Sequence, residues 1–165
     1  MLAIFSLGSC MGDSEALLRR AAALLEALPG ARPAGRSSLY ETDAIDVPPE
    51  FAGVKFLNAV VAIETDLPPK ALSAAMHAFE TALGRRRTGL RHEPRPIDID
   101  AIAIGDAASG DPALTLPHPE ASCRRFVMEP LAEIFPEYVL PGQSRAAREI
   151  ADALAGQGVR RIARL

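Results

Sequence analysis

Four stretches of the chain have the apolar patterns of β-strands, and they fall in residues 2–7, 36–42, 54–65 and 97–104. The first is a short apolar run closed by Gly8, which is typical of a buried strand. The third alternates clearly, so its successive residues face opposite sides of a sheet. One face then holds Leu57, Ala59, Val61 and Ile63, and the other holds Phe56, Asn58, Val60 and Ala62.

Two stretches between these strands predict helices, because their apolar residues recur every three or four positions. The first helix begins after Asp13, whose side chain suits an N-cap, and ends at Pro29-Gly30. The second begins at Pro68-Pro69 and ends at Gly84. The expected buried faces are Leu17, Ala21, Leu24 and Leu28 in the first helix, and Leu72, Met76, Phe79 and Leu83 in the second.

The elements follow one another as strand, helix, strand, strand, helix, strand. This order predicts an α+β fold, a ferredoxin-like βαββαβ antiparallel sheet with both helices on one face. A C-terminal extension follows, with helices expected near 124–133 and 144–155 and a short strand in 159–164. Because no internal repeat or linker interrupts the chain, we expect residues 1–165 to form one domain.

Alternation along the strands brings polar residues to the sheet face that the two helices leave open. If Leu57 and its neighbours meet the helices, Phe56 and Asn58 face the open side. The same rule turns Ile97 and Ile99 inward and places Asp98 and Asp100 on the open side. We therefore expect the functional site on this face.

The aspartate pair in the fourth strand is the first candidate for chemistry. The carboxylates of Asp98 and Asp100 point the same way, with about 6–7 Å between their Cα atoms. Such a pair suits Mg²⁺, which takes carboxylate oxygens together with substrate phosphates. The alternative for an Asp-x-Asp pair by itself is an acidic strand face in contact with solvent.

Arginines next to the aspartates strengthen the metal interpretation. The predicted loop 85–96 carries Arg85, Arg86, Arg87 and Arg91, and Arg95 lies three residues before Asp98. Guanidinium groups beside a metal-binding pair are what a triphosphate requires. The alternative is a GC-rich genome, because Lys55 and Lys70 are the only lysines of the chain.

Other polar and aromatic residues are candidates for substrate contacts. His118 lies between two prolines, where it is either structural or a phosphate ligand, and Arg124 and Arg125 open a predicted helix that would favour an anion. Phe56 and Phe126 are either core residues or a clamp for a flat heterocycle. Asn58 would then hydrogen-bond the polar edge of that ring.

Composition excludes several classes of protein. The net charge of −3 gives no overall field that would attract nucleic acid or an anionic membrane, and no stretch is long enough for an apolar span. Cys10 and Cys123 form no metal or disulfide pattern, so we expect a reducing, cytoplasmic location. Gly8-Ser9 matches neither the P-loop nor the dinucleotide-binding pattern.

Several motifs occur in order along the chain: Ser6-Leu-Gly-Ser9, Tyr40-Glu-Thr42, Phe56-Leu-Asn58-Ala, Glu80 followed by Gly84-Arg85, Arg95-Pro-Ile-Asp98-Ile-Asp100, Leu116-Pro-His118-Pro and Arg124-Arg-Phe126-Val. Together they resemble the 6-hydroxymethyl-7,8-dihydropterin pyrophosphokinases, also called 2-amino-4-hydroxy-6-hydroxymethyldihydropteridine diphosphokinases. The likeness extends from about residue 3 to residue 142.

The resemblance implies an enzyme of folate biosynthesis that transfers diphosphate from ATP to the pterin hydroxymethyl group and releases AMP. It implies two Mg²⁺ ions on Asp98 and Asp100, with Arg85 and Arg95 as the further catalytic residues. The implied ATP contacts are Glu80, Arg87, His92, Thr115, His118 and Arg124, and the implied pterin contacts are Thr42, Phe56, Asn58 and Phe126. The expected partners are these small molecules, with no nucleic acid and no membrane, and we expect a monomer, with a dimer as the alternative.

The chain departs from the family pattern at a few positions. Cys10 replaces the usual asparagine, His92-Glu93 replaces an aromatic residue and glycine, and Ala101 replaces a larger aliphatic residue. We expect these changes to weaken ATP affinity or closure of loop 85–96 before they affect the chemistry.

Three alternatives remain on the sequence alone. Another Mg-dependent phosphoryl or nucleotidyl transferase would use the same aspartates but would need no clamp for a ring. A diverged pseudoenzyme would be consistent with the altered loop. A ferredoxin-like binding module for RNA would need several exposed aromatic residues on its strands, and the chain has only two tyrosines and six phenylalanines.

Overall fold

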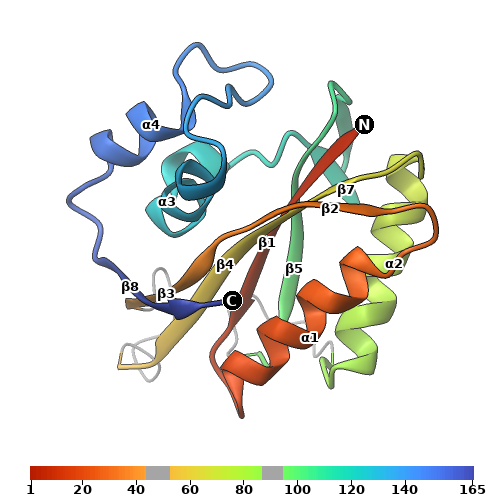
Figure 1. Cartoon of the computed structure of the whole chain (residues 1–165), viewed down its shortest axis with the longest axis horizontal. Coiled ribbons are helices and arrows are strands. Elements are labelled where there is room, and N and C mark those ends of the chain that lie inside the picture. Colours follow the sequence, from red (N-terminus) through yellow and green to blue (C-terminus); the bar gives the residue numbers. More distant parts are fainter. Residues whose placement is uncertain (44–52, 87–94) are drawn as a thin grey trace.

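The computed structural model describes residues 1–43, 53–86 and 95–165 (Figure 1). Its strands are β1 (Leu2–Ser9), β2 (Arg32–Arg36), β3 (Ser38–Asp43), β4 (Lys55–Glu64), β5 (Asp98–Ile104), β6 (Ser109–Asp111), β7 (Leu114–Leu116) and β8 (Val159–Arg164). Its helices are α1 (Ser14–Glu26), α2 (Pro69–Ala82), α3 (Arg125–Ile134) and α4 (Ala147–Ala153), with a 3-10 turn at Ala121–Cys123. Each predicted helix and strand has a counterpart.

The main sheet has six strands in the order β5-β1-β4-β3-β8, and β2 pairs with β4 off this path. All of its strand pairs are antiparallel. Helices α1 and α2 lie next to each other on one face of this sheet, and α3 and α4 lie across the other face (Figure 1). The expected antiparallel α+β fold with α1 and α2 on one face is therefore confirmed. The hairpin β6–β7 forms a separate two-stranded sheet that the sequence pattern did not predict.

The stretch predicted as one strand over 36–42 is divided at Ser37. The Ser37 amide donates to the Val60 carbonyl at 2.9 Å, and the Val60 amide donates to the Ser37 hydroxyl at 2.9 Å. Because a side-chain oxygen replaces a backbone acceptor at this point, the ladder along β4 is interrupted. The chain therefore passes from β2 to β3 while both strands stay paired with β4.

Helix α1 begins at the predicted cap, since the Asp13 carboxylate accepts a hydrogen bond from the Ala16 amide at 3.0 Å. Its fully buried residues are Leu18, Ala21, Ala22 and Leu25. The predicted face of Leu17, Ala21, Leu24 and Leu28 was thus wrong in part, because those three leucines are only partly buried at the edges of the stripe. In α2 the predicted Leu72, Met76 and Leu83 are buried, and Phe79 is partly buried.

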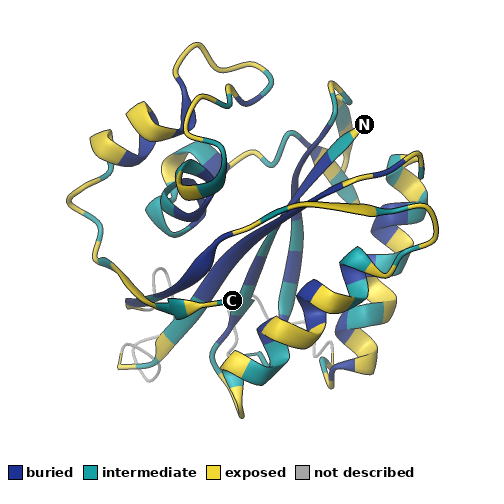
Figure 2. Ribbon diagram, in the orientation of Figure 1, coloured by how far each residue is buried: buried dark blue, intermediate teal, exposed yellow. Residues whose placement is uncertain are grey.

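The core between the sheet and these two helices follows the predicted strand alternation. Phe5 and Leu7 of β1, Val61 and Ile63 of β4, and Ile99 of β5 all belong to it. Figure 2 shows the buried residues concentrated along the central strands and on the helix surfaces that face them. The opposite set of strand residues therefore faces away from α1 and α2.

The second face of the sheet was predicted to be open, and this is only half correct. Helices α3 and α4 pack over it at Ile4, Val60 and Ala62, which are buried with Met128 and Leu131. Beyond Val60, towards the ends of β1 and β4 that carry Gly8 and Phe56, both residues keep partial exposure. The C-terminal extension therefore covers one end of this face and leaves the candidate site at the other.

The Glu133 carboxylate fixes α3 to the sheet. Glu133 accepts hydrogen bonds from the Ser38 amide at 2.7 Å, the Ser38 hydroxyl at 2.8 Å and the Tyr40 hydroxyl at 3.0 Å. Arg161 of β8 completes the cluster at 3.0 Å. The contacts join α3, β3 and β8, and so they hold the strand that carries Thr42 in place. Among the described residues, no helix is long and apolar enough to cross a membrane.

Candidate active site

Strand register brings the predicted substrate and metal residues into one row. Gly8 of β1 pairs with Asn58 of β4 on one side and with Asp98 of β5 on the other. Paired residues of neighbouring strands point to the same face, so Asn58 and Asp98 share the face away from α1 and α2. Asp100 joins them, because it pairs with Ser6, two residues before Gly8. The predicted convergence of Asn58 with both aspartates is confirmed.

Two arginines hold the Asp98 carboxylate. Arg85 Nη1 lies 2.5 Å from Asp98 Oδ1, and Arg95 Nη2 lies 2.7 Å from Asp98 Oδ2. Arg85 follows the C-terminal end of α2, and Arg95 directly precedes β5, so the two guanidiniums approach from different segments. The two predicted catalytic arginines thus already stand beside the aspartate pair, where charge-assisted hydrogen bonds neutralise one carboxylate.

Asp100 has no such arginine partner among the described residues, and the pKa of its carboxyl group is shifted. Burial, together with the negative charge of Asp98, raises the pKa of Asp100 to about 7. Arg95 and Arg85 act in the opposite direction but do not outweigh these effects. Two carboxylates this close cannot both carry charge at low cost unless a cation lies between them. The pair therefore fits the donor set of a hard divalent cation such as Mg²⁺.

Glu80 is buried beneath this cluster, where the helix pattern predicts no particular contact. One of its oxygens, Oε1, contacts Arg85 Nη1 and accepts a hydrogen bond from the Ile99 amide at 2.9 Å. Burial raises the pKa of Glu80, while the Ile99 amide and Arg85 counteract it. Glu80 thus links α2 to β5 through Arg85, and its implied contact with ATP stays a prediction.

His118 is held beside β5 in a defined tautomer. Its backbone amide donates to the Ile102 carbonyl at 2.9 Å, and its Nδ1 accepts from the Glu120 amide at 3.2 Å. Burial and then the charge of Arg124 lower the pKa of His118, so the neutral ring is favoured. Because Nδ1 is an acceptor, the proton of the neutral ring is on Nε2, which can donate to a phosphate oxygen.

Arg124 and Phe126 lie together at the start of α3. The Arg124 guanidinium stands 5.6 Å from the centroid of the Phe126 ring and also pairs with Glu120. Phe126 packs partly against the cluster under α3, and Phe56 of β4 is likewise partly exposed. Since Phe56 and Asn58 are two apart on one strand, Phe56 lies on the sheet face that α3 covers further along. Both rings are therefore partly exposed, and their implied contact with the pterin stays a prediction.

Asn58 is oriented by Thr42. Its Nδ2 donates to Thr42 Oγ1 at 2.9 Å, and both residues are only 3% exposed. The hydrogen bond joins β3 to β4 and fixes which edge of the amide faces the neighbouring strand β1. The two polar residues predicted for the pterin site therefore act as one unit.

Other predicted site residues lie in the β6–β7 hairpin or outside the described ranges. Thr115 is exposed in the β6–β7 hairpin, where its hydroxyl donates to the Asp111 carbonyl at 3.1 Å. Arg87 and His92, and with them most of loop 85–96, lie outside the described residues. Their implied roles at ATP remain predictions.

Cys10 makes hydrogen bonds that the sequence pattern did not predict. Its backbone amide donates to the Arg95 carbonyl at 3.3 Å, and its Sγ accepts from the Arg95 amide at 3.4 Å. Burial raises the pKa of the Cys10 thiol, so it stays protonated and also donates to the Arg95 carbonyl at 3.6 Å. Cys10 therefore holds the backbone of one of the two arginines on Asp98. Its place directly after the strand that carries Gly8 was the available signal.

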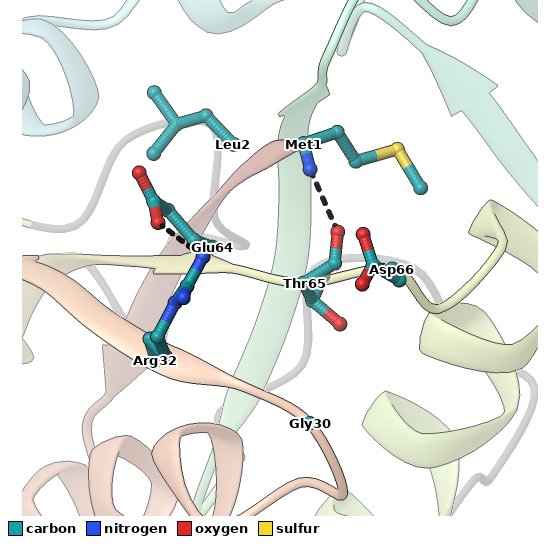
Figure 3. Close-up of a pocket in the computed structure, with 7 residues that line it drawn as sticks. All are labelled: Met1, Leu2, Gly30, Arg32, Glu64, Thr65 and Asp66. Atoms are coloured by element: carbon teal, nitrogen blue, oxygen red, sulfur yellow. Dashed lines mark hydrogen bonds and ion pairs between the residues drawn. The ribbon is translucent and has the colours of Figure 1, made fainter.

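A polar hollow of about 420 Å³ lies at the other end of the sheet (Figure 3). There the terminal amine of Met1 donates to the Thr65 carbonyl at 2.8 Å, and Arg32 pairs with Glu64 at 3.2 Å. Leu2 pairs with Glu64, six residues before Gly8 pairs with Asn58, so about 20 Å separates the hollow from the candidate site. None of the predicted site residues lines it.

Comparisons with known proteins agree with the geometry. A family model described as 7,8-dihydro-6-hydroxymethylpterin-pyrophosphokinase (HPPK) matches residues 4–136. The chain is 41% identical over 161 residues to the 2-amino-4-hydroxy-6-hydroxymethyldihydropteridine pyrophosphokinase of Methylorubrum extorquens, over 97% of this chain and 98% of that protein. It is 33% identical over 160 residues to the protein of the same name from Pseudomonas aeruginosa, over 95% and 94%.

The fold is shared with a larger protein. A crystal structure of Plasmodium falciparum HPPK-DHPS with pterin and p-hydroxybenzoate superposes with a TM-score of 0.72 at 14% identity. The match covers 94% of this chain and 44% of that chain. At this identity the likeness supports the fold alone.

Proposed function

The chain belongs to the 7,8-dihydro-6-hydroxymethylpterin-pyrophosphokinase family, and from this premise we propose how its residues carry out the reaction. The protein is an enzyme of folate biosynthesis. It transfers diphosphate from ATP to 6-hydroxymethyl-7,8-dihydropterin and gives the pterin diphosphate and AMP. The observation that supports this best is the row that joins Asn58, Gly8 and Asp98 across three strands. A residue suited to a heterocycle and one suited to a cation face the same space.

Asp98 and Asp100 would hold Mg²⁺, and we infer two ions. When bound, the ions supply charge neutralisation at the phosphate oxygens of ATP. The aspartates fit this role because both carboxylates face one side of β5, and because burial, together with the charge of Asp98, raises the pKa of Asp100. The carboxylates are kept in place by Arg85, Arg95 and the ladder between β5 and β1.

Arg85 and Arg95 would turn from Asp98 to the phosphates when nucleotide binds. A planar guanidinium matches the geometry of phosphate oxygens, and it keeps its charge throughout. His118 would donate from Nε2 and Arg124 would approach from the start of α3, both from segments that follow β5 in the chain. The phosphate chain is thus surrounded by donors that are preorganised by the fold.

Asn58, supported by Thr42, would hydrogen-bond the pterin, while Phe56 and Phe126 stack on its two faces. The hydroxymethyl oxygen then attacks the β-phosphorus in line, its bond to that phosphorus forms as the bond to the α,β-bridging oxygen breaks, and AMP leaves. The hydroxyl proton is released to water in this step. Catalysis consists of positioning and electrostatic stabilisation, without a covalent enzyme intermediate.

We infer that residues 1–165 act as one pyrophosphokinase domain, that Glu80, Arg87, His92 and Thr115 lie near ATP, and that the enzyme is a cytoplasmic monomer. Sedimentation at working concentrations would test the oligomeric state directly.

The experiment that tests the function is incubation with ATP, Mg²⁺ and 6-hydroxymethyl-7,8-dihydropterin, with AMP and pterin diphosphate measured together. We expect the two products in equal amounts, and their loss in Asp98→Ala and Asp100→Ala. Asp152→Ala is the matched control, because Asp152 is an exposed aspartate on α4. Release of ADP, or turnover that is indifferent to the pterin, would contradict the assignment.

A further inference from the structure

Gly8 occupies the centre of the row between Asn58 and Asp98, and it carries no side chain there. A β-carbon built on Gly8 would lie 3.4 Å from Asn58 Oδ1 and 3.9 Å from Asp98 Cβ. It would therefore project from the same sheet face as these two residues, into the space between them. Any ligand that touches both Asn58 and the Asp98 side of the site has to cross this position.

The fold itself does not explain a glycine at this position. Gly8 is not among the glycines with positive φ, so its backbone conformation is open to other residues. The distances of 3.4 Å and 3.9 Å are ordinary contacts, so a methyl group would fit among the described neighbours. Gly35 is different, because a β-carbon there would meet Ile134 at 3.3 Å, and packing accounts for that glycine.

Asn58 provides an independent observation that points to a ligand. Its amide nitrogen is used by Thr42, whereas Oδ1, the atom that faces Gly8, accepts no hydrogen bond from the described residues. Asn58 as a residue is 3% exposed, yet no side-chain atom of the described residues is both buried and without a hydrogen-bond partner, so Oδ1 keeps contact with the space outside. A ligand N–H group that occupies the space over Gly8 can therefore reach Oδ1.

The width of the gap indicates how large such a ligand is. Gly8 separates Asn58 from Asp98 by two strand spacings, which amounts to about 9–10 Å between their Cα atoms. A single six-membered ring that donates to Asn58 ends over Gly8. A fused pair of rings with an exocyclic hydroxymethyl group extends across it towards Asp98.

We propose that Gly8 is a specificity-determining residue, whose missing side chain admits the second ring of a flat bicyclic, N–H-bearing acceptor between Asn58 and Asp98. This inference rests on the proposed function, since it concerns the acceptor of that reaction. A methyl group at position 8 would occupy the plane in which the second ring lies. It would meet only the near edge of the first ring at Asn58, and it would leave the nucleotide beyond Asp98 with its contacts.

The test is the variant Gly8→Ala. We expect its KM for 6-hydroxymethyl-7,8-dihydropterin to rise about tenfold or more, since one extra methyl group in a fitted pocket discriminates at this level. Its affinity for ATP with Mg²⁺ is expected to match that of the wild type. Binding of oxidised 6-hydroxymethylpterin, followed by its fluorescence with Mg²⁺ and α,β-methylene-ATP present, should weaken to the same extent.

A one-ring probe separates specificity from general damage. In competition experiments 2-amino-4-hydroxypyrimidine, which carries the first ring only, should lose less affinity in Gly8→Ala than the pterin does. The inference is overturned if the folded variant binds the pterin as well as the wild type does, or if both probes weaken equally.

Two further glycine variants serve as controls. Gly35→Ala crowds a distant strand glycine, so it should lower the melting temperature without changing the KM for pterin. Gly156→Ala meets nothing within 4 Å and should change neither. A rise in KM for Gly35→Ala equal to that of Gly8→Ala would overturn the inference in favour of lost stability. If wild-type protein itself fails to transfer diphosphate to the pterin, the proposed function has failed, whereas normal wild-type turnover with an unaffected Gly8→Ala contradicts this inference alone.

Discussion

Arg95 reaches Asp98 with 2.7 Å between Nη2 and Oδ2, and this contact places a fixed positive charge where the proposed metal would bind. Arg85 occupies the other oxygen of the same carboxylate at 2.5 Å. In the absence of metal and nucleotide, the arginines thus act as counterions of Asp98. A divalent cation has to compete with them, and the guanidiniums it displaces become available to phosphate oxygens.

Substitution of Arg95 should therefore have opposite effects on two ligands. In Arg95→Met the competing charge is gone, so Mn²⁺ binding without nucleotide, measured by electron paramagnetic resonance, should become tighter. Affinity for the ATP analogue α,β-methylene-ATP should fall by about 10- to 100-fold, because a charge-assisted hydrogen bond to phosphate is lost.

Arg160→Met is the matched control for this pair of measurements. Arg160 is 73% exposed and pairs with Glu41 at 2.9 Å on β3, away from the aspartates. Neither affinity should change in that variant. A change of both affinities in the same direction for Arg95→Met would contradict the exchange of counterions.

Asp100 should make the metal-free protein less stable as the pH rises. Burial and the charge of Asp98 raise the pKa of Asp100 to about 7 in the folded state. In the unfolded chain the pKa of an aspartate is about 3.9. Between these values the folded protein binds more protons than the unfolded chain, so the free energy of unfolding falls with rising pH. Above about pH 7 the loss is complete.

Asp100→Asn removes this dependence and serves as its test. In EDTA at pH 8 the variant should have a higher melting temperature than the wild type, by about 2–4 °C for each ~1 kcal/mol gained in the free energy of unfolding. This difference should vanish near pH 4. Asp152→Asn, on the exposed side of α4, should show no such trend. A constant offset between Asp100→Asn and wild type at all pH values would refute the explanation.

Glu80 should matter for stability more than an average charged residue of a helix. In Glu80→Ala, Arg85, which is 16% exposed, would lose a partner and the Ile99 amide would lose its acceptor. We expect a loss of about 3–5 kcal/mol in the free energy of unfolding, measured by urea denaturation. Glu80→Gln should lose less, because its amide oxygen still accepts from Ile99.

The comparison for this series is Glu137→Ala. Glu137 is 66% exposed and its pair with Arg148 lies in solvent, so its removal should cost less than about 1 kcal/mol. Equal losses in the two alanine variants would mean that the buried link between α2 and β5 contributes nothing beyond a surface pair.

The sequence predicted the face that carries the site because strand alternation is a local property. Asn58 and Asp98 are on different strands, yet the two-residue period of each places both opposite the helices. Pairing of Gly8 with both residues could not be predicted in this way, since it depends on register between strands that are distant in sequence. The glycine was visible in the sequence, but its neighbours were not.

Long-range packing accounts for the remaining differences. Helix periodicity gives no reason to bury Glu80, because the partner that allows it, the Ile99 amide, is on another element. The cover of α3 over Val60 and Ala62 depends on the C-terminal extension, whose position no local pattern sets. The division at Ser37 likewise requires the Val60 backbone, 23 residues away.

Thr42 should affect the pterin and leave the nucleotide alone. In Thr42→Val the shape is kept but the acceptor for Asn58 Nδ2 is lost, so the amide is no longer held with Oδ1 towards Gly8. We expect the KM for the pterin to rise about tenfold, since a hydrogen bond in a buried site contributes about 0.5–1.5 kcal/mol and an unpaired polar group costs more. Steady-state kinetics with the pterin and with ATP varied separately measure this difference.

Thr42→Ser keeps the hydroxyl and should restore the KM for the pterin. Thr81→Val removes an exposed hydrogen bond to the His77 carbonyl and should change the KM for neither substrate. If Thr42→Ser behaves like Thr42→Val, or if the KM for ATP rises in step with that for the pterin, Thr42 acts through the fold and not through Asn58.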